Sequence, residues 1–184
     1  MYPPKILHVD ENHPSLLKGL EALKYENILA YKTPLTTILK NVDQYEGIVI
    51  RSRFPIDKSF IDAAHKLRFI ARVGAGLENI DQEYAHSKNI HLIAAPEGNR
   101  NAVGEHTVGL LLGLMNKLRS GHQSIQKGKW LREAHRGFEL ENKTVGIIGY
   151  GNTGKNLAQK LKGFNVRILC HDILPNVDDE NATQ

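Results

Sequence analysis

The chain has 184 residues, of which 41% are hydrophobic and 24% are charged, and its formal net charge is +4. This composition is that of a folded protein with one large or two small domains, and it argues against wholesale disorder. The apolar runs fall short of the roughly 18 residues of a transmembrane helix, the N-terminus lacks a secretory signal pattern, and the charge is too dispersed to indicate nucleic-acid binding.

The chain contains a single cysteine, Cys170, and nine histidines. One cysteine allows neither an internal disulfide nor a multi-cysteine metal site. The histidines show no convincing metal-ligand spacing with a third ligand. We therefore expect no bound metal and a reducing, cytoplasmic setting.

Short apolar runs alternate with helix-like stretches in the first half of the chain. The spacing predicts strands over 6–9, 27–31, 47–50, 69–73 and 90–93, and helices over 14–23, 35–39, 57–65 and 81–87. Such alternation predicts a parallel sheet with right-handed crossovers. A turn-rich segment, 95–99, follows, so we expect one domain over 1–98 and a second over 99–184.

The second half opens with an apolar helix, expected over 101–118. Because this helix is apolar nearly all round, we expect it to be buried between domains or subunits. A basic stretch over 119–136 follows and carries one large aromatic residue, Trp130. A strand–helix–strand unit then runs over 143–172, and the polar residues 175–184 are expected to form no further element.

The most informative motif is the glycine-rich loop 149–154, which reads Gly-Tyr-Gly-Asn-Thr-Gly, follows an apolar strand and opens a helix. This context is that of the dinucleotide-binding fingerprint; the alternative is a glycine turn without a ligand. The first glycine would permit a tight turn, the second the approach of a pyrophosphate, and the third close helix–strand packing. The helix N-terminus would face the phosphates. The expected dinucleotide contacts come from Gly149, Gly151, Asn152, Thr153 and Gly154.

Asp172 ends the second strand of this unit, 18 residues after Gly154. A carboxylate at this point can accept hydrogen bonds from both ribose hydroxyls of NAD, and it would repel the 2′-phosphate of NADP. The next residues, Ile173 and Leu174, offer no arginine to that phosphate. We therefore expect NAD as the cofactor, with a solvated strand-end aspartate as the alternative.

Further motifs precede this loop in order along the chain, at 50–53, 72–81, 95–99, 103–107, 127–130 and 139–144. With these motifs the chain resembles the D-isomer-specific 2-hydroxyacid dehydrogenases over essentially its whole length, and most of all the branch that oxidises 3-phosphoglycerate. The resemblance implies an α/β fold: a flavodoxin-like parallel-sheet substrate domain followed by the first half of a Rossmann NAD-binding domain.

The resemblance also implies a substrate site in the first domain. The loop 74–76 would present backbone N–H groups to the carboxylate of a small anionic 2-hydroxy or 2-keto acid, and Ala75 would also approach the nicotinamide. The segment 51–53 would lie near the substrate phosphate, since arginine makes fork-shaped contacts with phosphate. An ordinary turn and a solvated strand end are the respective alternatives. The expected substrate contacts come from Arg51, Ser52, Arg53, Gly74, Ala75 and Gly76.

Trp130 resembles a residue by which family members dock against a partner subunit, which implies a homodimer or larger homo-oligomer. Packing of Trp130 on its own domain is the alternative. Neither a membrane nor a nucleic acid is expected as a partner; nucleic-acid binding through 117–136 is the weaker interpretation, because that stretch interleaves basic and polar residues as a solvated face would.

Catalysis by the family needs a general-acid histidine, a carboxylate that orients it and an arginine that clamps the substrate. The resemblance places all three in the second half of the dinucleotide domain, after residue 184. We therefore assign no catalytic residue and expect these residues alone to be inactive. Two functions stay open: the N-terminal part of an NAD-dependent D-2-hydroxyacid oxidoreductase, and a non-enzymatic NAD(H)-sensing or corepressor-like module.

Overall fold

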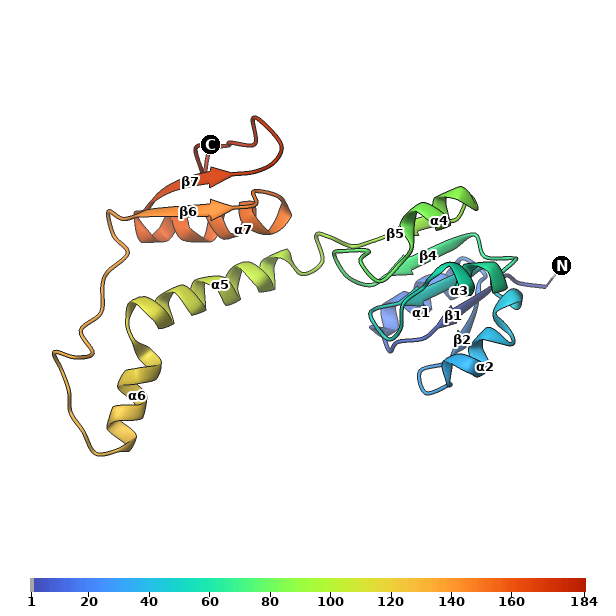
Figure 1. The fold of residues 1–184 in the computed structure, drawn as a ribbon, viewed down its shortest axis with the longest axis horizontal. Coiled ribbons are helices and arrows are strands. Elements are labelled where there is room, and N and C mark those ends of the chain that lie inside the picture. The colour runs from blue at the N-terminus through green and yellow to red at the C-terminus, as the bar shows by residue number, and fades with distance from the viewer. Residues whose placement is uncertain (1) are drawn as a thin grey trace. The chain divides into compact units, whose positions relative to one another are not determined.

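The structure is a computed structural model that describes residues 2–184, and it divides into two units, Met1–Gly98 and Asn99–Gln184. Each unit holds its own sheet and its own hydrophobic core. In Figure 1 the first unit runs from blue to green and the second from yellow-green to red. No helix within residues 2–184 is both long and apolar enough to cross a lipid bilayer.

A five-stranded parallel sheet with the order β2-β1-β3-β4-β5 organises the first unit. Its strands are β1 (Lys5–His8), β2 (Glu26–Leu29), β3 (Gly47–Ile50), β4 (Phe69–Arg72) and β5 (His91–Ile93). All four residues of the central strand β3 are buried, as is usual for a parallel strand covered on both faces. The strand order is the flavodoxin-like one, so the predicted parallel α/β sheet is confirmed.

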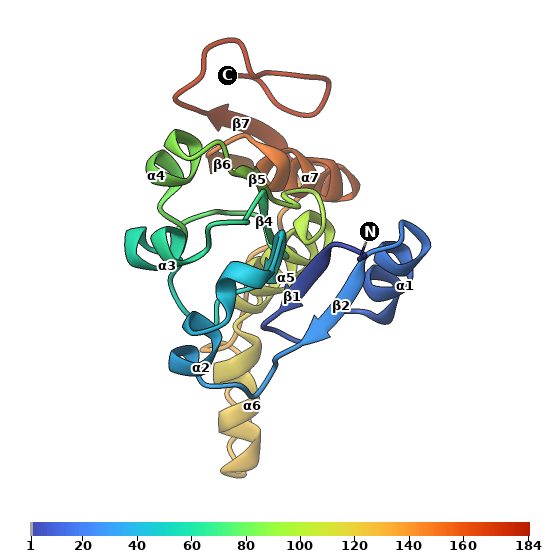
Figure 2. The same cartoon turned by 90° about the vertical axis from the view of Figure 1, so that its right-hand side faces the viewer.

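Helices connect these strands and cover both faces of the sheet. They are α1 (Pro14–Ala22), α2 (Leu35–Leu39), the short 3-10 helix η1 (Val42–Gln44), α3 (Lys58–Ala63) and α4 (Gln82–Ser87). Figure 2 shows α1 on one side of the sheet and α3 and α4 on the other. Aspartates start two of these helices: Asp57 accepts the Phe60 N–H at 2.9 Å, and Asp81 accepts the Tyr84 N–H at 3.1 Å.

The second unit is built from two parallel strands and three α-helices within residues 99–184. Its elements are α5 (Arg100–Met115), α6 (Leu118–Gln126), β6 (Thr144–Ile148), α7 (Asn152–Leu161), the 3-10 helix η2 (Lys162–Phe164) and β7 (Arg167–His171). The core of this unit lies between β6, β7, α7 and one face of α5.

The helix α5 packs against α7, as Figure 1 shows. Gly104 permits this close approach, because a Cβ at that position would collide with a side chain of α7. Lys160 of α7 donates a hydrogen bond to Asn101 of α5 at 2.7 Å. Val108 and Leu111 pack against the core of the unit. A single face of α5 is thus fixed by packing inside the unit.

The apolar helix predicted over 101–118 is α5, which ends three residues earlier, at Met115, and a second helix, α6, follows in the basic stretch. Lys117 adopts a left-handed conformation, with φ of 50°, between the end of α5 and the start of α6. Within this chain Leu110 and Leu114 are 63% and 76% exposed, so burial of this face between domains or subunits stays a prediction. The apolar composition of the helix exceeds what one packed face can cover.

The tail after β7, residues 175–184, forms no further helix or strand, as predicted, but hydrogen bonds hold it to β7. Thr183 makes a parallel bridge with Leu169 of β7. The Cys170 N–H donates to the Thr183 carbonyl at 2.8 Å, and the Thr183 N–H donates to the Ile168 carbonyl at 3.1 Å. Ala182 beside this bridge is buried. The tail therefore extends the two-stranded sheet by a short parallel segment.

Candidate functional site

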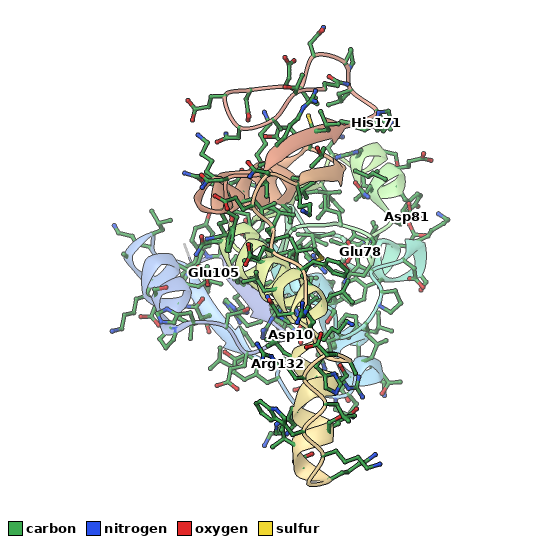
Figure 3. All side chains as sticks on the ribbon, turned by 90° about the vertical axis from the view of Figure 1, so that its left-hand side faces the viewer. Asp10, Glu78, Asp81, Glu105, Arg132 and His171 are labelled. Atoms are coloured by element: carbon green, nitrogen blue, oxygen red, sulfur yellow. The ribbon has the colours of Figure 1, made fainter. Side chains whose placement is uncertain are left out.

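The glycine-rich loop leaves β6 at the carboxyl end of the two-stranded sheet. Gly149 has a φ of +88°, which favours glycine because a side chain would be strained there. Its N–H donates at 2.8 Å to the carbonyl of His171, the last residue of β7, which is labelled in Figure 3. The loop therefore begins at a point fixed to the neighbouring strand.

The other two glycines of the loop have different surroundings. At Gly154 a Cβ would collide with the carbonyl of Gly149, so glycine lets α7 approach the turn. At Gly151 a Cβ would meet no atom within 4 Å, and this residue is the N-cap of α7. These surroundings match the expected roles, close packing for Gly154 and open approach at Gly151, while ligand contact stays a prediction.

The first turn of α7 is open to an anion. No side chain within residues 2–184 caps it, and both Asn152 and Thr153 are exposed. Unpaired N–H groups and the positive end of the helix dipole favour phosphate at such a helix start. The ammonium of Lys155 lies 5.7 Å from the centre of the Tyr150 ring, which adds a positive charge to this turn.

Asp172 lies directly after β7, and both of its carboxylate oxygens accept backbone hydrogen bonds. Oδ1 accepts from the Leu174 N–H at 3.1 Å, and Oδ2 accepts from the Tyr150 N–H at 2.6 Å. Hydrogen bonds from Leu174 and Tyr150 lower the pKa of this carboxyl, so it is charged at neutral pH. Each oxygen keeps a second lone pair for a ribose hydroxyl. The bond from Tyr150 could not be predicted from the sequence, because it links segments 22 residues apart in the chain.

The first unit carries a second candidate site after β4, at the carboxyl edge of its sheet. Gly74 and Gly76 are closely packed: a Cβ would collide with the Arg72 guanidinium at the first and with the Glu78 carboxylate at the second. The Gly74 N–H donates to the Arg72 carbonyl at 2.9 Å. Within residues 2–184, no acceptor meets the N–H groups of Ala75 and Gly76. Two unpaired amides in a small-residue loop suit an anion.

Arg72 is a candidate functional residue that the sequence analysis did not assign. It ends β4, and its side chain is 15% exposed. Its Nη2 donates to Oε1 of Glu78, labelled in Figure 3, at 2.9 Å, and its Nε donates to the Arg51 carbonyl at 3.1 Å. Its guanidinium thus lies beside the loop 74–76, paired with the Glu78 carboxylate. Open α/β sheets bind ligands at the carboxyl ends of their strands, so the place of Arg72 at the end of a predicted strand could have marked it as a candidate.

Arg51 and Ser52, which follow β3, are both exposed. The Arg51 N–H donates to Oδ2 of Asp10, labelled in Figure 3, at 2.6 Å, which fixes the backbone at this point. The Arg51 guanidinium makes one long hydrogen bond, from Nη1 to the Glu11 carbonyl at 3.3 Å. Most of its donors therefore face solvent, as a phosphate-binding arginine requires.

Arg53 is used differently from the expectation. Its Nη1 donates at 3.0 Å and 2.6 Å to the carbonyls of Val9 and Ala30, and its Nη2 donates at 2.6 Å to that of Thr33. These carbonyls lie after β1 and β2, so the guanidinium ties together backbone at the sheet edge. Of the two arginines, Arg51 is the one whose guanidinium donors stay accessible to a phosphate.

His8 and Trp130 lie outside both candidate sites. No cluster of three His, Cys, Asp or Glu side chains within residues 2–184 could hold a metal ion. His8 is fully buried on β1, with Nε2 2.8 Å from Oδ1 of Asn27. Trp130 is 79% exposed, so packing on its own domain is not what the structure shows.

Comparison with known proteins assigns these features to one family. The family model described as "D-isomer specific 2-hydroxyacid dehydrogenase, catalytic domain" matches residues 6–164. D-3-phosphoglycerate dehydrogenase of Archaeoglobus fulgidus is 37% identical over 147 residues, which cover 80% of this chain and 28% of that protein. Hydroxypyruvate reductase of Thermotoga maritima is 33% identical over 164 residues, which cover 89% of this chain and 53% of that protein.

Among solved structures, NAD+-bound 3-phosphoglycerate dehydrogenase of Entamoeba histolytica matches with a TM-score of 0.73 and 27% identity, over 99% of this chain and 57% of that one. The chain belongs to the D-isomer specific 2-hydroxyacid dehydrogenase family, which confirms the resemblance. It spans between 28% and 53% of the length of the two curated relatives.

Proposed function

We propose that residues 1–98 form the substrate-binding unit, and 99–184 the first part of the NAD-binding unit, of an NAD-dependent D-2-hydroxyacid oxidoreductase. The observation that supports this most is the loop at the end of β6. A tight glycine turn, an open helix start and a charged carboxylate lie together there, which fits a pyrophosphate beside a ribose. Bound NAD would carry the hydride, while residues of this loop would hold its phosphates.

Asp172 supports NAD rather than NADP. Its charged carboxylate would repel a 2′-phosphate and accept ribose hydroxyls. Calorimetric titration of the chain should show NAD bound more tightly than NADP. Asp172→Ala should weaken NAD binding by roughly 10- to 150-fold, since a hydrogen bond to a charged group contributes about 1.5–3 kcal/mol.

The matched variant for this test is Asp172→Asn. It keeps an acceptor for the Tyr150 N–H but removes the negative charge, so it should reduce the preference for NAD over NADP while preserving the loop. Tighter binding of NADP than NAD by the unmodified chain would contradict the assignment.

For the substrate we propose 3-phosphoglycerate, oxidised by the whole protein to 3-phosphohydroxypyruvate in serine biosynthesis. The amides of Ala75 and Gly76, with Arg72 beside them, suit a carboxylate, and the exposed Arg51 suits a phosphate. The match to a hydroxypyruvate reductase supports a second candidate, an unphosphorylated 2-hydroxy or 2-keto acid.

Ligand titration followed by NMR separates these substrates. If the substrate is phosphorylated, 3-phosphoglycerate should bind more tightly than D-glycerate, and Arg51→Ala should remove that difference while leaving D-glycerate binding intact. Arg68→Ala is the matched control, because Arg68 is an exposed arginine paired with Glu46 at 3.3 Å. Equal binding of the two acids would favour the unphosphorylated substrate.

We also propose that the chain associates with a second copy of itself through the segment around Trp130, in a reducing cytoplasmic setting. The indole is 79% exposed beside a groove lined by Ile125, Leu131 and His135. Exposed aromatic anchors of this kind dominate many protein interfaces. Light scattering should show a dimer or larger species that Trp130→Ala shifts towards monomer. Tyr2→Ala, which removes an aromatic side chain that is 96% exposed, should leave the association unchanged.

A further inference from the structure

Tyr150, the second residue of the glycine-rich loop, donates hydrogen bonds to two carboxylates, one from its backbone and one from its side chain. Its N–H donates to Asp172 Oδ2 at 2.6 Å, and its hydroxyl donates to Asp179 Oδ1 at 2.8 Å. The side chain is 1% exposed, and it packs in the core that also contains Cys170 and Ala182. The loop is thus anchored inwards at a single residue between two glycines.

The carboxylate that meets the Tyr150 hydroxyl comes from the tail after β7, 29 residues further along the chain. This tail is itself ordered by several hydrogen bonds. The Asn181 N–H donates to Asp179 Oδ1 at 2.8 Å, and the Asp179 N–H donates to the Ala182 carbonyl at 3.2 Å. Together with the bridge from Thr183 to β7, these bonds fix the position of Asp179.

The ionisation of the pair suits a strong hydrogen bond. Partial desolvation raises the pKa of the exposed Asp179, but hydrogen bonds from Asn181 and Tyr150 outweigh it and lower the pKa overall. Burial first, and then the hydrogen bond to Asp179, raises the pKa of Tyr150. At neutral pH a protonated phenol therefore donates to a charged carboxylate, which is stronger than a bond between neutral groups.

We propose that Asp179 is a positioning residue of the dinucleotide site, which acts through Tyr150 to fix the peptide between Gly149 and Gly151. That peptide leads directly into the first turn of α7, so its orientation aims the N–H groups of this turn at the pyrophosphate. Glycine-rich loops lose much conformational entropy when a ligand orders them. A loop that is ordered beforehand binds more tightly. The inference rests on the proposed binding of NAD.

Tyr150→Phe tests this inference, because it removes the hydroxyl and keeps the ring in the core. We expect the Kd for NAD to rise roughly 3- to 10-fold, which corresponds to the net contribution of one hydrogen bond. In the chain without ligand, hydrogen exchange of the Tyr150 amide should become faster. Both measurements are made at a temperature where thermal unfolding shows every variant to be folded, so a loss of global stability alone would not change the Kd.

Variants of the tail complete the experiment. Asp179→Ala should weaken NAD binding as Tyr150→Phe does, and the double variant should bind no more weakly than the weaker single variant, because both remove one interaction. Asp179→Asn keeps an acceptor oxygen and should restore most of the affinity. Asp178→Asn removes a charge from the neighbouring exposed residue and should leave the Kd unchanged.

The outcomes separate this inference from the proposed function. If the unmodified chain binds NAD and Tyr150→Phe alters neither the Kd nor the amide exchange, Asp179 does not position the loop, and the proposed function stands. An equal effect from Asp178→Asn would also overturn the inference, since it would indicate a general effect of charge. If the unmodified chain binds no NAD, both the proposed function and the inference are wrong.

Discussion

The two units use the same alternation of strands and helices, but they cover their apolar residues to very different extents. Ile48 in β3 is 0% exposed, with β1 and β4 on either side and helices over both faces of the sheet. Ile148 in β6 is 90% exposed, although it too lies in a parallel strand. Both residues are isoleucines, and both lie in parallel strands. The number of neighbouring layers decides burial, because one sheet face needs another element against it.

The exposed apolar side chains of the second unit lie on several elements. They include Leu110, Leu114, Leu118, Ile125, Trp130, Phe138, Ile148 and Ile173. Contiguous apolar surface of several hundred Å² is a common mark of an interaction site. The first unit thus buries most of its apolar strand residues in its own core, whereas the second leaves much apolar surface exposed.

The largest effect should come from truncating the same residue type in each unit. Ile48→Ala should lower the free energy of unfolding by about 2–5 kcal/mol, since it removes buried methyl groups and leaves a cavity. Ile148→Ala should change it by less than about 0.5 kcal/mol. Urea unfolding followed by circular dichroism measures both. Equal losses would show that Ile148 is buried in solution, which would remove the contrast between the units.

A smaller effect, confined to the second unit, should separate its two loop glycines. Gly154→Ala should destabilise the unit by about 1–3 kcal/mol, because the added methyl group must push against the Gly149 carbonyl. Gly151→Ala should unfold at nearly the same temperature as the unmodified chain, since a Cβ there meets open space. It should nevertheless weaken NAD binding. Thermal unfolding and calorimetric titration together test this pair. A reversed order of stabilities would contradict the assigned packing.

The smallest effect should be a pH dependence confined to the first unit. Burial lowers the pKa of His8, and its hydrogen bond with Asn27 opposes this only in part. The folded unit therefore favours neutral His8, so its stability is complete above the ordinary pKa near 6.5 and falls as the pH drops below that value. Hydrogen exchange measured separately for the two units at about pH 7.5 and about pH 5.5 should show this loss. His8→Gln should reduce it, and an equal loss in that variant would assign the effect to another group.

Much of the first unit could be predicted from its sequence, because its strands are short apolar runs between turn residues. The strand expected over 47–50 is β3, and the one expected over 69–73 is β4 with a single residue less. The glycine spacing likewise located the turn at Gly149 and the helix that follows it. These features depend on local conformation and on periodicity, which the sequence records directly.

What could not be predicted depends on contacts between distant segments. No proline or glycine follows Met115 directly, so the predicted helix ran three residues beyond the end of α5. The bridge from Thr183 to β7 joins a polar tail to a strand that precedes it, and no local pattern marks such a pairing. The use of Arg53 by carbonyls after β1 and β2 is of the same kind. Arginine at a strand end looks alike in sequence whether it binds a ligand or its own backbone.

The hydrogen bonds of Arg53 also shape the electrostatic potential at the carboxyl edge of the first sheet. Parallel strands end in carbonyl oxygens, which carry partial negative charge and would repel an approaching anion. The guanidinium neutralises three of these oxygens by pointing its donors at them. An anion that approached Arg51 or Arg72 would then meet less of this partial negative charge. Arg53 would thus favour an anionic ligand at this edge without touching it, through the peptide dipoles that it screens.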